Sequence, residues 1–165
     1  MRSMEQPKRK PNRLPDFDYS QSGGYFITVC TKDKAKILCD IVGGGVLDAP
    51  ECRLSEKGKV VEKYIKSINN VDYARVDKYA IMPNHIHMII MVEDSFGTSR
   101  TPSPTNAKIP HLISTFKRFC NKELGESIFQ RSYHDHIIRD EKDYLVRWNY
   151  IDTSPAKWQD DEYYG

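Results

Sequence analysis

Apolar and polar residues alternate with two different periods along this chain, and the two periods predict two kinds of element. Runs rich in β-branched and aromatic residues predict strands, over residues 25–31, 75–81, 85–93 and 132–139. Apolar residues that recur every three or four positions predict helices, over residues 55–69, 110–124 and 140–155. Ser55 and Asp140 stand at the start of two of these helices as typical N-caps, and Pro110 suits the first position of the other.

The predicted order is strand, helix, strand, strand, helix, strand, helix. Two strand–helix–strand halves joined through a central hairpin are typical of the ferredoxin-like fold. We therefore expect an α+β protein with a ferredoxin-like antiparallel sheet (βαββαβ) and an additional C-terminal helix. The strand over residues 85–93 is apolar on both faces after its histidines, which indicates a central position in the sheet. Residues 32–53 show a mixed pattern with three successive glycines, where short strands are expected.

Length and composition describe one globular unit with a basic extension. The chain has 165 residues, of which 39% are hydrophobic and 29% charged, a balance typical of folded proteins. Residues 1–19 place prolines among basic residues, so we expect an extended basic N-terminal arm followed by one domain over residues 20–165. No apolar run approaches the roughly 20 residues of a membrane span, and no apolar segment follows the basic N-terminus as in a secretory signal. These features predict a soluble, cytoplasmic protein.

Two histidines at the start of the predicted central strand are the sharpest chemical feature. His85 and His87 are two residues apart, so their side chains point to the same face of the strand. Two neutral imidazoles side by side can chelate one divalent metal and leave positions for substrate. The alternative is a pair of strand histidines held by ordinary hydrogen bonds. His134 and His136 repeat the spacing on the last strand, where they could reach the metal or contact phosphates.

The last predicted helix has one aromatic residue outside its apolar stripe. Tyr144, Trp148 and Ile151 form that stripe, and Tyr150 lies beside it. A phenol has a pKa of about 10, so it becomes a useful nucleophile only where a metal or a cation assists the reaction. Otherwise Tyr150 is an ordinary core or surface aromatic residue.

Basic residues form local patches rather than an overall excess. The net charge is only +2, which is too small to indicate a nucleic-acid partner by itself. Lys117, Arg118 and Lys122 are predicted to share one face of the second helix, and further cations follow at Arg131, Arg139 and Arg147. Such patches are either solvated surface or parts of a groove for phosphates.

Four blocks of sequence, spread over residues 13–158, show a family resemblance. They read RLPDFDYSQSGGYFITVCT, MPNHIHMII, FQRSYHDHIIRDEKDY and WNYIDTSPAKW. Together they resemble the REP-associated tyrosine transposases, a branch of the insertion-sequence single-tyrosine transposases within the HUH nuclease superfamily. Because four blocks occur in the order and at the spacing found in that family, the resemblance is far more specific than the His85–His87 pair alone.

The resemblance implies a metal-dependent transposase or nickase that cleaves and rejoins single-stranded DNA in transposition and recombination. His85 and His87 correspond to the two motif histidines of the family, which bind a divalent cation, Mg²⁺ or Mn²⁺. Tyr150 corresponds to the nucleophile, which forms a 5′-phosphotyrosine and releases a 3′-hydroxyl. The substrates of the family are palindromic repeats folded as hairpins, and its members act as monomers or dimers, so a homodimer is one expectation. The residues expected to contact DNA are Arg13, Lys117, Arg118, Lys122, Arg131, His136 and Arg139.

One position departs from the family pattern. Four residues after its tyrosine the family commonly places an amide that ligates the metal, and this chain has Ser154 there. A serine hydroxyl is a shorter and weaker ligand, for which Asp152 or a strand histidine could substitute. The departure supports an alternative function, a hairpin-binding protein that has lost or nearly lost strand transfer. A third alternative, an unrelated His-x-His metalloenzyme on a β-barrel, is disfavoured by the helical segments over residues 55–69 and 110–124.

Overall fold

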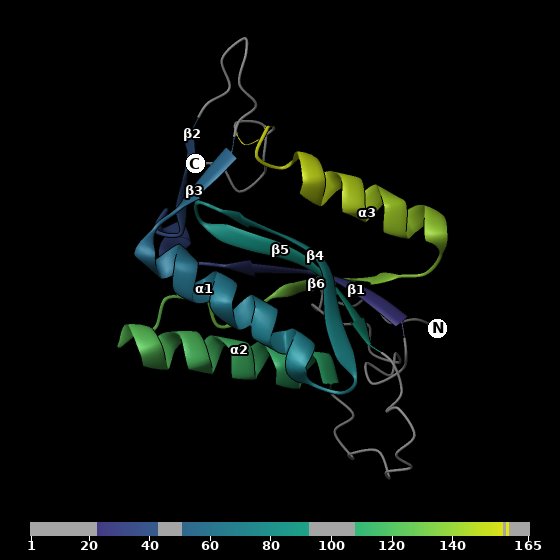
Figure 1. Ribbon diagram of the computed structural model, residues 1–165, viewed down its shortest axis with the longest axis horizontal. Helices are drawn as coiled ribbons and strands as arrows, with labels where there is room; N and C mark the ends of the chain where they lie inside the picture. The colour runs from purple at the N-terminus through teal and green to yellow at the C-terminus, as the bar shows by residue number, and fades with distance from the viewer. Residues whose placement is uncertain (1–22, 43–50, 93–107, 157, 159–165) are drawn as a thin grey trace, which may run out of the picture.

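A computed structural model of the chain describes residues 23–42, 51–92, 108–156 and 158. Figure 1 shows the elements, which are β1 (Gly23–Cys30), β2 (Cys39–Val42), β3 (Glu51–Leu54), α1 (Glu56–Ser67), β4 (Ala74–Met82), β5 (His85–Val92), α2 (Lys108–Leu124), β6 (His134–Ile138) and α3 (Glu141–Thr153). Short 3₁₀ helices cover Lys32–Lys34 and Ile68–Asn70. The predicted arm with Arg13, its boundary at residues 19–20 and the run of three glycines lie outside the described residues.

Four of the strands form one antiparallel sheet in the order β4-β5-β1-β6. β1 and β4 run parallel with β5 between them, and β5 and β6 run parallel with β1 between them. Each half is thus a split βαβ unit, with α1 or α2 as its crossover helix, which is the ferredoxin-like arrangement. The predicted α+β fold and the central position of β5 are confirmed. The short strands β2 and β3, which lie between β1 and α1 in the sequence, pair with each other in a separate sheet.

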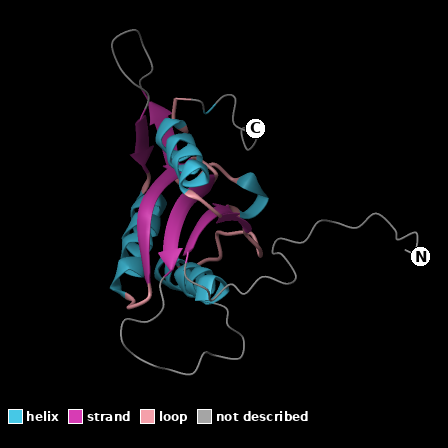
Figure 2. Ribbon diagram, turned by 90° about the vertical axis from the view of Figure 1, so that its right-hand side faces the viewer, coloured by secondary structure: helices cyan, strands magenta, loops and turns pink. Residues whose placement is uncertain are grey.

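Side-chain alternation along β1 and β5 divides the core into two clusters. The larger cluster packs against α1 and α2, and the smaller one joins Phe26, Ile89 and Ile151 beneath α3. Figure 2 shows the strands side by side with helices on both sides of the sheet. His85 and His87 share the strand face of Ile89, because residues two apart on a strand point the same way. The histidine pair therefore faces α3 rather than α1 and α2.

Two predicted helix caps are present. The Ser55 hydroxyl accepts a hydrogen bond of 3.0 Å from the Gly58 N–H, and the Asp140 carboxylate accepts one of 2.8 Å from the Asp143 N–H. Both satisfy a donor that the first helical turn leaves without a partner. The start of α2 differs from the prediction, because the helix begins two residues before Pro110. A proline is tolerated there, since N–H groups of the first turn have no helical acceptor.

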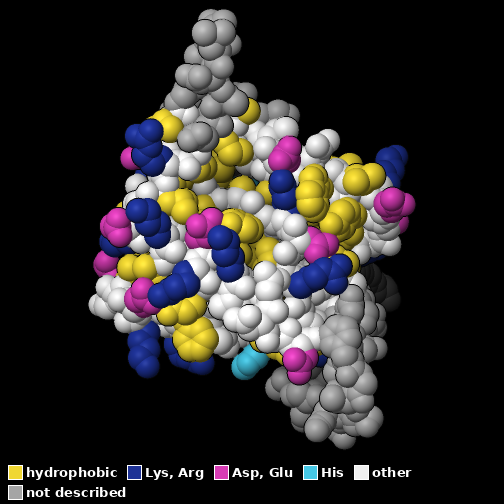
Figure 3. All heavy atoms as spheres, in the orientation of Figure 1, with side chains coloured by type: hydrophobic (Ala, Val, Ile, Leu, Met, Phe, Trp, Pro, Cys, Tyr) yellow, Lys and Arg dark blue, Asp and Glu magenta, His cyan; other side chains and the backbone are white. Residues whose placement is uncertain are grey.

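Part of the exposed surface of α3 is apolar. Leu145 and Val146 are exposed, and Figure 3 shows hydrophobic side chains gathered over this helix. Within the described part of the chain, no helix has both the length and the apolar character needed to cross a membrane. The expected homodimer stays a prediction.

Candidate active site

Two imidazoles converge beneath α3 at the beginning of β5. The Nε2 atoms of His85 and His87 lie 3.1 Å apart, and both side chains are buried. Two nitrogens bound to one ion at about 2.1 Å and at right angles are about 3.0 Å apart. The two histidines therefore fit chelation of a divalent ion from one side, with further coordination positions left for oxygen ligands.

A neighbour on the Nδ1 side orients each imidazole. Asn84 Oδ1 lies 2.8 Å from Nδ1 of His85, and the hydroxyl of Thr28 lies 2.9 Å from Nδ1 of His87. An amide oxygen only accepts, so Nδ1–H of His85 donates to it, and Nε2 of His85 faces Nε2 of His87. The Thr28 hydroxyl can donate or accept. His87 can therefore donate from Nε2 to His85, or present a second lone pair to an ion.

Aromatic rings enclose the histidine pair and include the predicted nucleophile. Phe26 stacks on His87 with ring centroids 5.3 Å apart, and Trp158 lies over His85 at 6.0 Å. The ring of Tyr150 meets His87 edge-on at 5.1 Å, while 38% of this tyrosine stays exposed. A partly exposed phenol beside two buried imidazoles can meet a substrate that approaches from solvent.

Ser154 lies at the end of α3 and is buried. Its hydroxyl donates a hydrogen bond of 2.7 Å to the carbonyl oxygen of Tyr150, as helical serines can do with the residue four positions earlier. Asp152, the other predicted oxygen ligand, pairs with Lys78 Nζ at 2.8 Å. The described residues contain no group of three or more His, Cys, Asp or Glu side chains that could hold an ion. Substrate or water could complete the coordination of an ion on the histidine pair.

A charged cluster joins β6 to α3 next to these rings. Nε2 of His136 and Oδ2 of Asp143 lie 2.7 Å apart, and Nε of Arg147 donates to Oδ1 of Asp143 at 3.3 Å. The backbone N–H of Arg139 also donates to this carboxylate. Partial burial raises the pKa of Asp143, but the hydrogen bonds and charge around it outweigh burial and lower this pKa overall. Asp143 is therefore held as a carboxylate between the strand and the helix.

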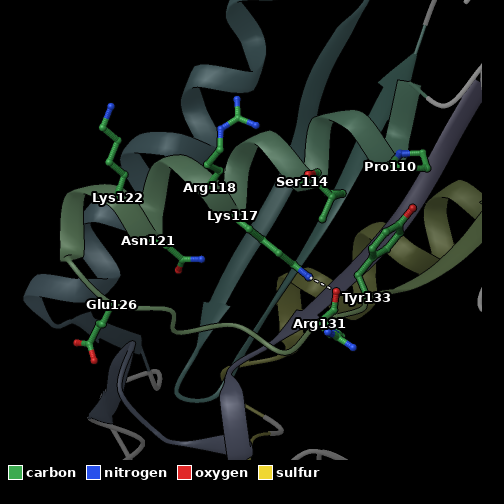
Figure 4. A pocket seen from close by; sticks show the side chains of 10 residues that line it. Pro110, Ser114, Lys117, Arg118, Asn121, Lys122, Glu126, Arg131 and Tyr133 are labelled. Atoms are coloured by element: carbon green, nitrogen blue, oxygen red, sulfur yellow. Dashed lines mark hydrogen bonds between the residues drawn. The ribbon is translucent and has the colours of Figure 1, made fainter. Parts of the chain in front are cut away.

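A hollow of about 830 Å³ lies along α2. Its lining includes Lys117, Arg118, Lys122 and Arg131, all predicted DNA contacts, together with Tyr133. Figure 4 shows Lys117 pointing towards Arg131, while Arg118 and Lys122 point from the other side of α2. Cations from the helix and from the following loop thus line one hollow. Lys117 does not share a helix face with Arg118 and Lys122 as predicted, because positions five apart differ by about 140° around a helix.

Lys117 also has a structural role in this hollow. Its Nζ donates to the carbonyl oxygens of Gln130, Arg131 and Ser132 at 2.8, 3.2 and 2.9 Å. Burial lowers the pKa of Lys117 to about 8. Three carbonyls accept from the three N–H donors of Lys117, so this side chain holds the loop that contains Arg131 in place. Towards a ligand, Lys117 therefore contributes positive charge rather than hydrogen bonds.

A second hollow of about 660 Å³ adjoins the first. The residues that line both hollows are Lys117, Asn121 and Arg131. The second hollow extends to Lys32, which follows Thr31, and the N–H of Thr31 donates to the carbonyl oxygen of Asn84 at 3.0 Å. It therefore reaches the end of the sheet at which β5 and its histidines begin.

Comparison with known proteins places this arrangement in a known fold. No protein-family model matches the sequence. An uncharacterized protein of Haemophilus influenzae is 31% identical, with 94% of this chain and 93% of that protein covered. A second protein of the same organism, named "Putative REP-associated tyrosine transposase", is 25% identical, with 85% and 74% covered. A solved REP-associated tyrosine transposase bound to a REP hairpin has a TM-score of 0.60 and 18% identity, covering 94% of this chain and 74% of that one.

This chain has the fold of a REP-associated tyrosine transposase. The predicted resemblance to that family is confirmed. At 31% identity over nearly the whole length of both, the chain and the uncharacterized Haemophilus protein belong to one family.

Within the transposase fold, the predicted residues separate onto the two faces of the sheet. His85, His87 and Tyr150 lie together where α3 packs on the sheet. The cations of α2 lie on the opposite face. His136 and Arg139 contact Asp143 at the edge formed by β6, and Arg13 lies outside the described residues. The roles of all these residues in metal and DNA binding stay predictions.

Sequence reasoning missed Thr28 and Phe26, which lie against the histidines and the tyrosine. Thr28 lies directly opposite His87 in the register of β1 and β5, so correct strand pairing is the signal that could have found it. Phe26 and Arg147 meet at a ring contact between residues far apart in sequence. No local pattern marks that contact.

Proposed function

We propose that this chain is a divalent-metal-dependent, single-tyrosine transposase that cleaves and rejoins single-stranded hairpin DNA. The observation that supports this most directly is the position of Tyr150, whose ring lies 5.1 Å from that of His87. Nε2 of the second histidine, His85, lies 3.1 Å from Nε2 of His87. A tyrosine beside a metal site is one arrangement that supports covalent catalysis at a phosphodiester.

His85 and His87 would hold a Mg²⁺ or Mn²⁺ ion through their Nε2 atoms. A bound ion supplies Lewis-acid polarisation of a phosphate oxygen. Mn²⁺ suits two imidazoles better than Mg²⁺, which prefers oxygen ligands. The 3.1 Å separation of the two nitrogens and the Nδ1 partners Asn84 and Thr28 support this assignment.

Tyr150 is the residue of this chain that changes covalently in the proposed reaction. Its oxygen forms a bond to phosphorus while the bond from phosphorus to the 3′ oxygen breaks. The products are a 5′-phosphotyrosine and a 3′-hydroxyl, because the phenol proton passes to water and the 3′ oxygen takes a proton from water. A 3′-hydroxyl can attack the phosphotyrosine in reverse, so rejoining needs no external energy source.

The hollow along α2 is the proposed place of the hairpin. Its cations, which include Arg118 and Lys122, provide the positive charge that phosphates require. The adjoining hollow leads to the end of the sheet where β5 begins, so a single strand leaving the hairpin there would approach the histidines on the other face. The similar REP-associated tyrosine transposase was solved with a REP hairpin bound, which supports this class of ligand.

A second candidate function is hairpin binding without strand transfer. Ser154 favours it, because this residue stands where the family commonly has an amide and its hydroxyl donates to the Tyr150 carbonyl oxygen. A protein of this kind would bind hairpins without forming a covalent product at any metal concentration.

A covalent-trapping experiment separates the two functions. Hairpins from repeats beside the gene, labelled at the 3′ end, are incubated with protein and Mn²⁺ or Mg²⁺ and run on a denaturing gel. We expect a metal-dependent shifted band that Tyr150→Phe and His87→Ala both lack, while each variant binds the hairpin within about threefold of the unaltered protein. Tight hairpin binding without any band would contradict the transposase and support the second function.

A further inference from the structure

Arg147 lies one helical turn before Tyr150 on α3 and has no role in the reaction as described so far. Residues three apart are neighbours on a helix surface. The two side chains share the ring of Phe26, with the guanidinium 5.3 Å from its centroid and the Tyr150 ring edge-on at 5.8 Å. Phe26 also stacks on His87. One aromatic ring thus brings together a cation, the proposed nucleophile and a proposed metal ligand.

The contacts of Arg147 leave the end of its guanidinium open to a further ligand. Its Nε donates to Asp143 at 3.3 Å, and 31% of the side chain is exposed. Among the described residues, no hydrogen bond involves the two Nη atoms of Arg147. An arginine held at Nε and over an aromatic ring is oriented in advance, and its Nη groups form the fork that binds two phosphate oxygens.

Two neighbouring charges, on Lys78 and Asp143, already have partners. Lys78 pairs with Asp152 at 2.8 Å on the other side of α3. The carboxylate of Asp143 contacts both Arg147 and His136, and the contact with His136 is the shorter one at 2.7 Å. In the described cation–π contacts, Arg147 is the cation over a ring that touches both the nucleophile and a histidine of the pair.

We propose that Arg147 binds the phosphodiester that Tyr150 attacks, and that Asp143 and His136 are positioning residues that hold its guanidinium in place. This inference rests on the proposed function. Arg147 forms no covalent bond. Its Nη–H groups donate to non-bridging phosphate oxygens while the Tyr150 oxygen bonds to phosphorus and the 3′ oxygen leaves. Donors that are already in place stabilise the negative charge on these oxygens best. We therefore expect Arg147 to affect the reaction rate more than the affinity for the hairpin.

The first test uses metal-free protein and dimethyl phosphate, a phosphodiester without base or sugar. The Nε–Hε signals of the arginines are followed by NMR during titration, and the Arg147 signal is assigned by its loss in Arg147→Lys. Arg53, exposed on β3, is the internal control. We expect the Arg147 signal to shift saturably and further than that of Arg53. Equal shifts of the two signals would overturn the inference.

The second test measures the single-turnover rate of phosphotyrosine formation at saturating hairpin with Mn²⁺. Arg147→Met keeps an apolar stem without the charge, and we expect a rate about 100-fold lower with hairpin affinity within about threefold. Lys142→Met, which alters an exposed cation of the same helix, should react like the unaltered protein. About 20 mM guanidinium ion should restore part of the rate of Arg147→Ala, a recovery that a structural role would not produce.

The outcomes distinguish this inference from the proposed function. A covalent product that forms equally fast in Arg147→Met refutes the inference and leaves the proposed function intact. An NMR shift at Arg147 without any covalent product in the unaltered protein refutes the proposed function and supports Arg147 as a phosphodiester-binding residue. Asp143→Asn should weaken the dimethyl phosphate shift at Arg147, and an unchanged shift would rule out the positioning role of Asp143.

Discussion

The hydroxyl of Thr28 lies 2.9 Å from Nδ1 of His87, on the neighbouring strand of the sheet. The two residues face each other in the register of β1 and β5, and both are buried. A ligating imidazole commonly bonds its other nitrogen to a fixed partner, which sets its tautomer and orientation. Strand pairing in this protein therefore also orients one of the two proposed metal ligands.

Replacing Thr28 tests whether this orientation matters for metal binding. Thr28→Val keeps the side-chain shape but removes the hydroxyl, so Nδ1 of His87 loses its partner. We expect the affinity for Mn²⁺, measured by calorimetry without DNA, to fall about tenfold. Thr28→Ser retains the hydroxyl and should keep most of the affinity. Equal Mn²⁺ affinity in Thr28→Val and the unaltered protein would show that the contact does not support the metal site.

Replacing Ser154 tests the departure from the family pattern. Ser154→Asn introduces the amide that the family commonly has, and an amide oxygen that reaches the ion should raise Mn²⁺ affinity about tenfold. Thr153→Asn is the matched control, because the Thr153 hydroxyl also donates to the carbonyl four residues earlier. If the two variants bind Mn²⁺ alike, this end of α3 does not contribute a ligand.

The hollow along α2 predicts a measurable salt dependence of hairpin binding. Arg118 and Lys122 are exposed cations that line this hollow. Replacing either one by glutamine should reduce the slope of the logarithm of the binding constant against the logarithm of the salt concentration by about 1. Fluorescence anisotropy with a labelled hairpin at several salt concentrations gives the slope. Lys59→Gln changes an exposed cation of α1 and should leave it unchanged. A slope unaffected by replacing both Arg118 and Lys122 would place the hairpin elsewhere.

The pKa of Lys117 predicts how stability varies with pH. Burial lowers this pKa from 10.5 to about 8 in the folded protein, so between these two values the unfolded chain binds more protons. Raising the pH in this window therefore favours the folded state, by on the order of 1 kcal/mol for this group. Denaturation with urea at pH 7.5 and 9.5 measures the change, and Lys117→Met should lack this contribution.

Lys117→Met should also loosen the loop that follows α2, because three backbone carbonyls lose their donor. We expect a lower free energy of unfolding than for Lys122→Met, which removes an exposed lysine of the same helix. The same pH dependence in Lys117→Met and the unaltered protein would contradict the assignment of the titrating group to Lys117.

Much of the fold could be predicted from the sequence because several local signals agree. The caps at Ser55 and Asp140 and the strand periods each point to the element that forms. The start of α2 was misplaced because a proline fits several positions of a first helical turn, so Pro110 alone does not define where the helix begins.

The sequence by itself determined which residues could perform the chemistry. His85 and His87 share a face in any extended strand, and Tyr150 lies off the apolar stripe of its helix whatever that helix packs against. Only the tertiary structure decided which of them meet. Thr28 and His87 are 59 residues apart in the chain, and the contact of Tyr150 with His87 requires α3 to lie across the same face of the sheet. The roles of Lys117 and Arg147 were decided in the same way, because the carbonyls around one and the ring beneath the other come together only through packing.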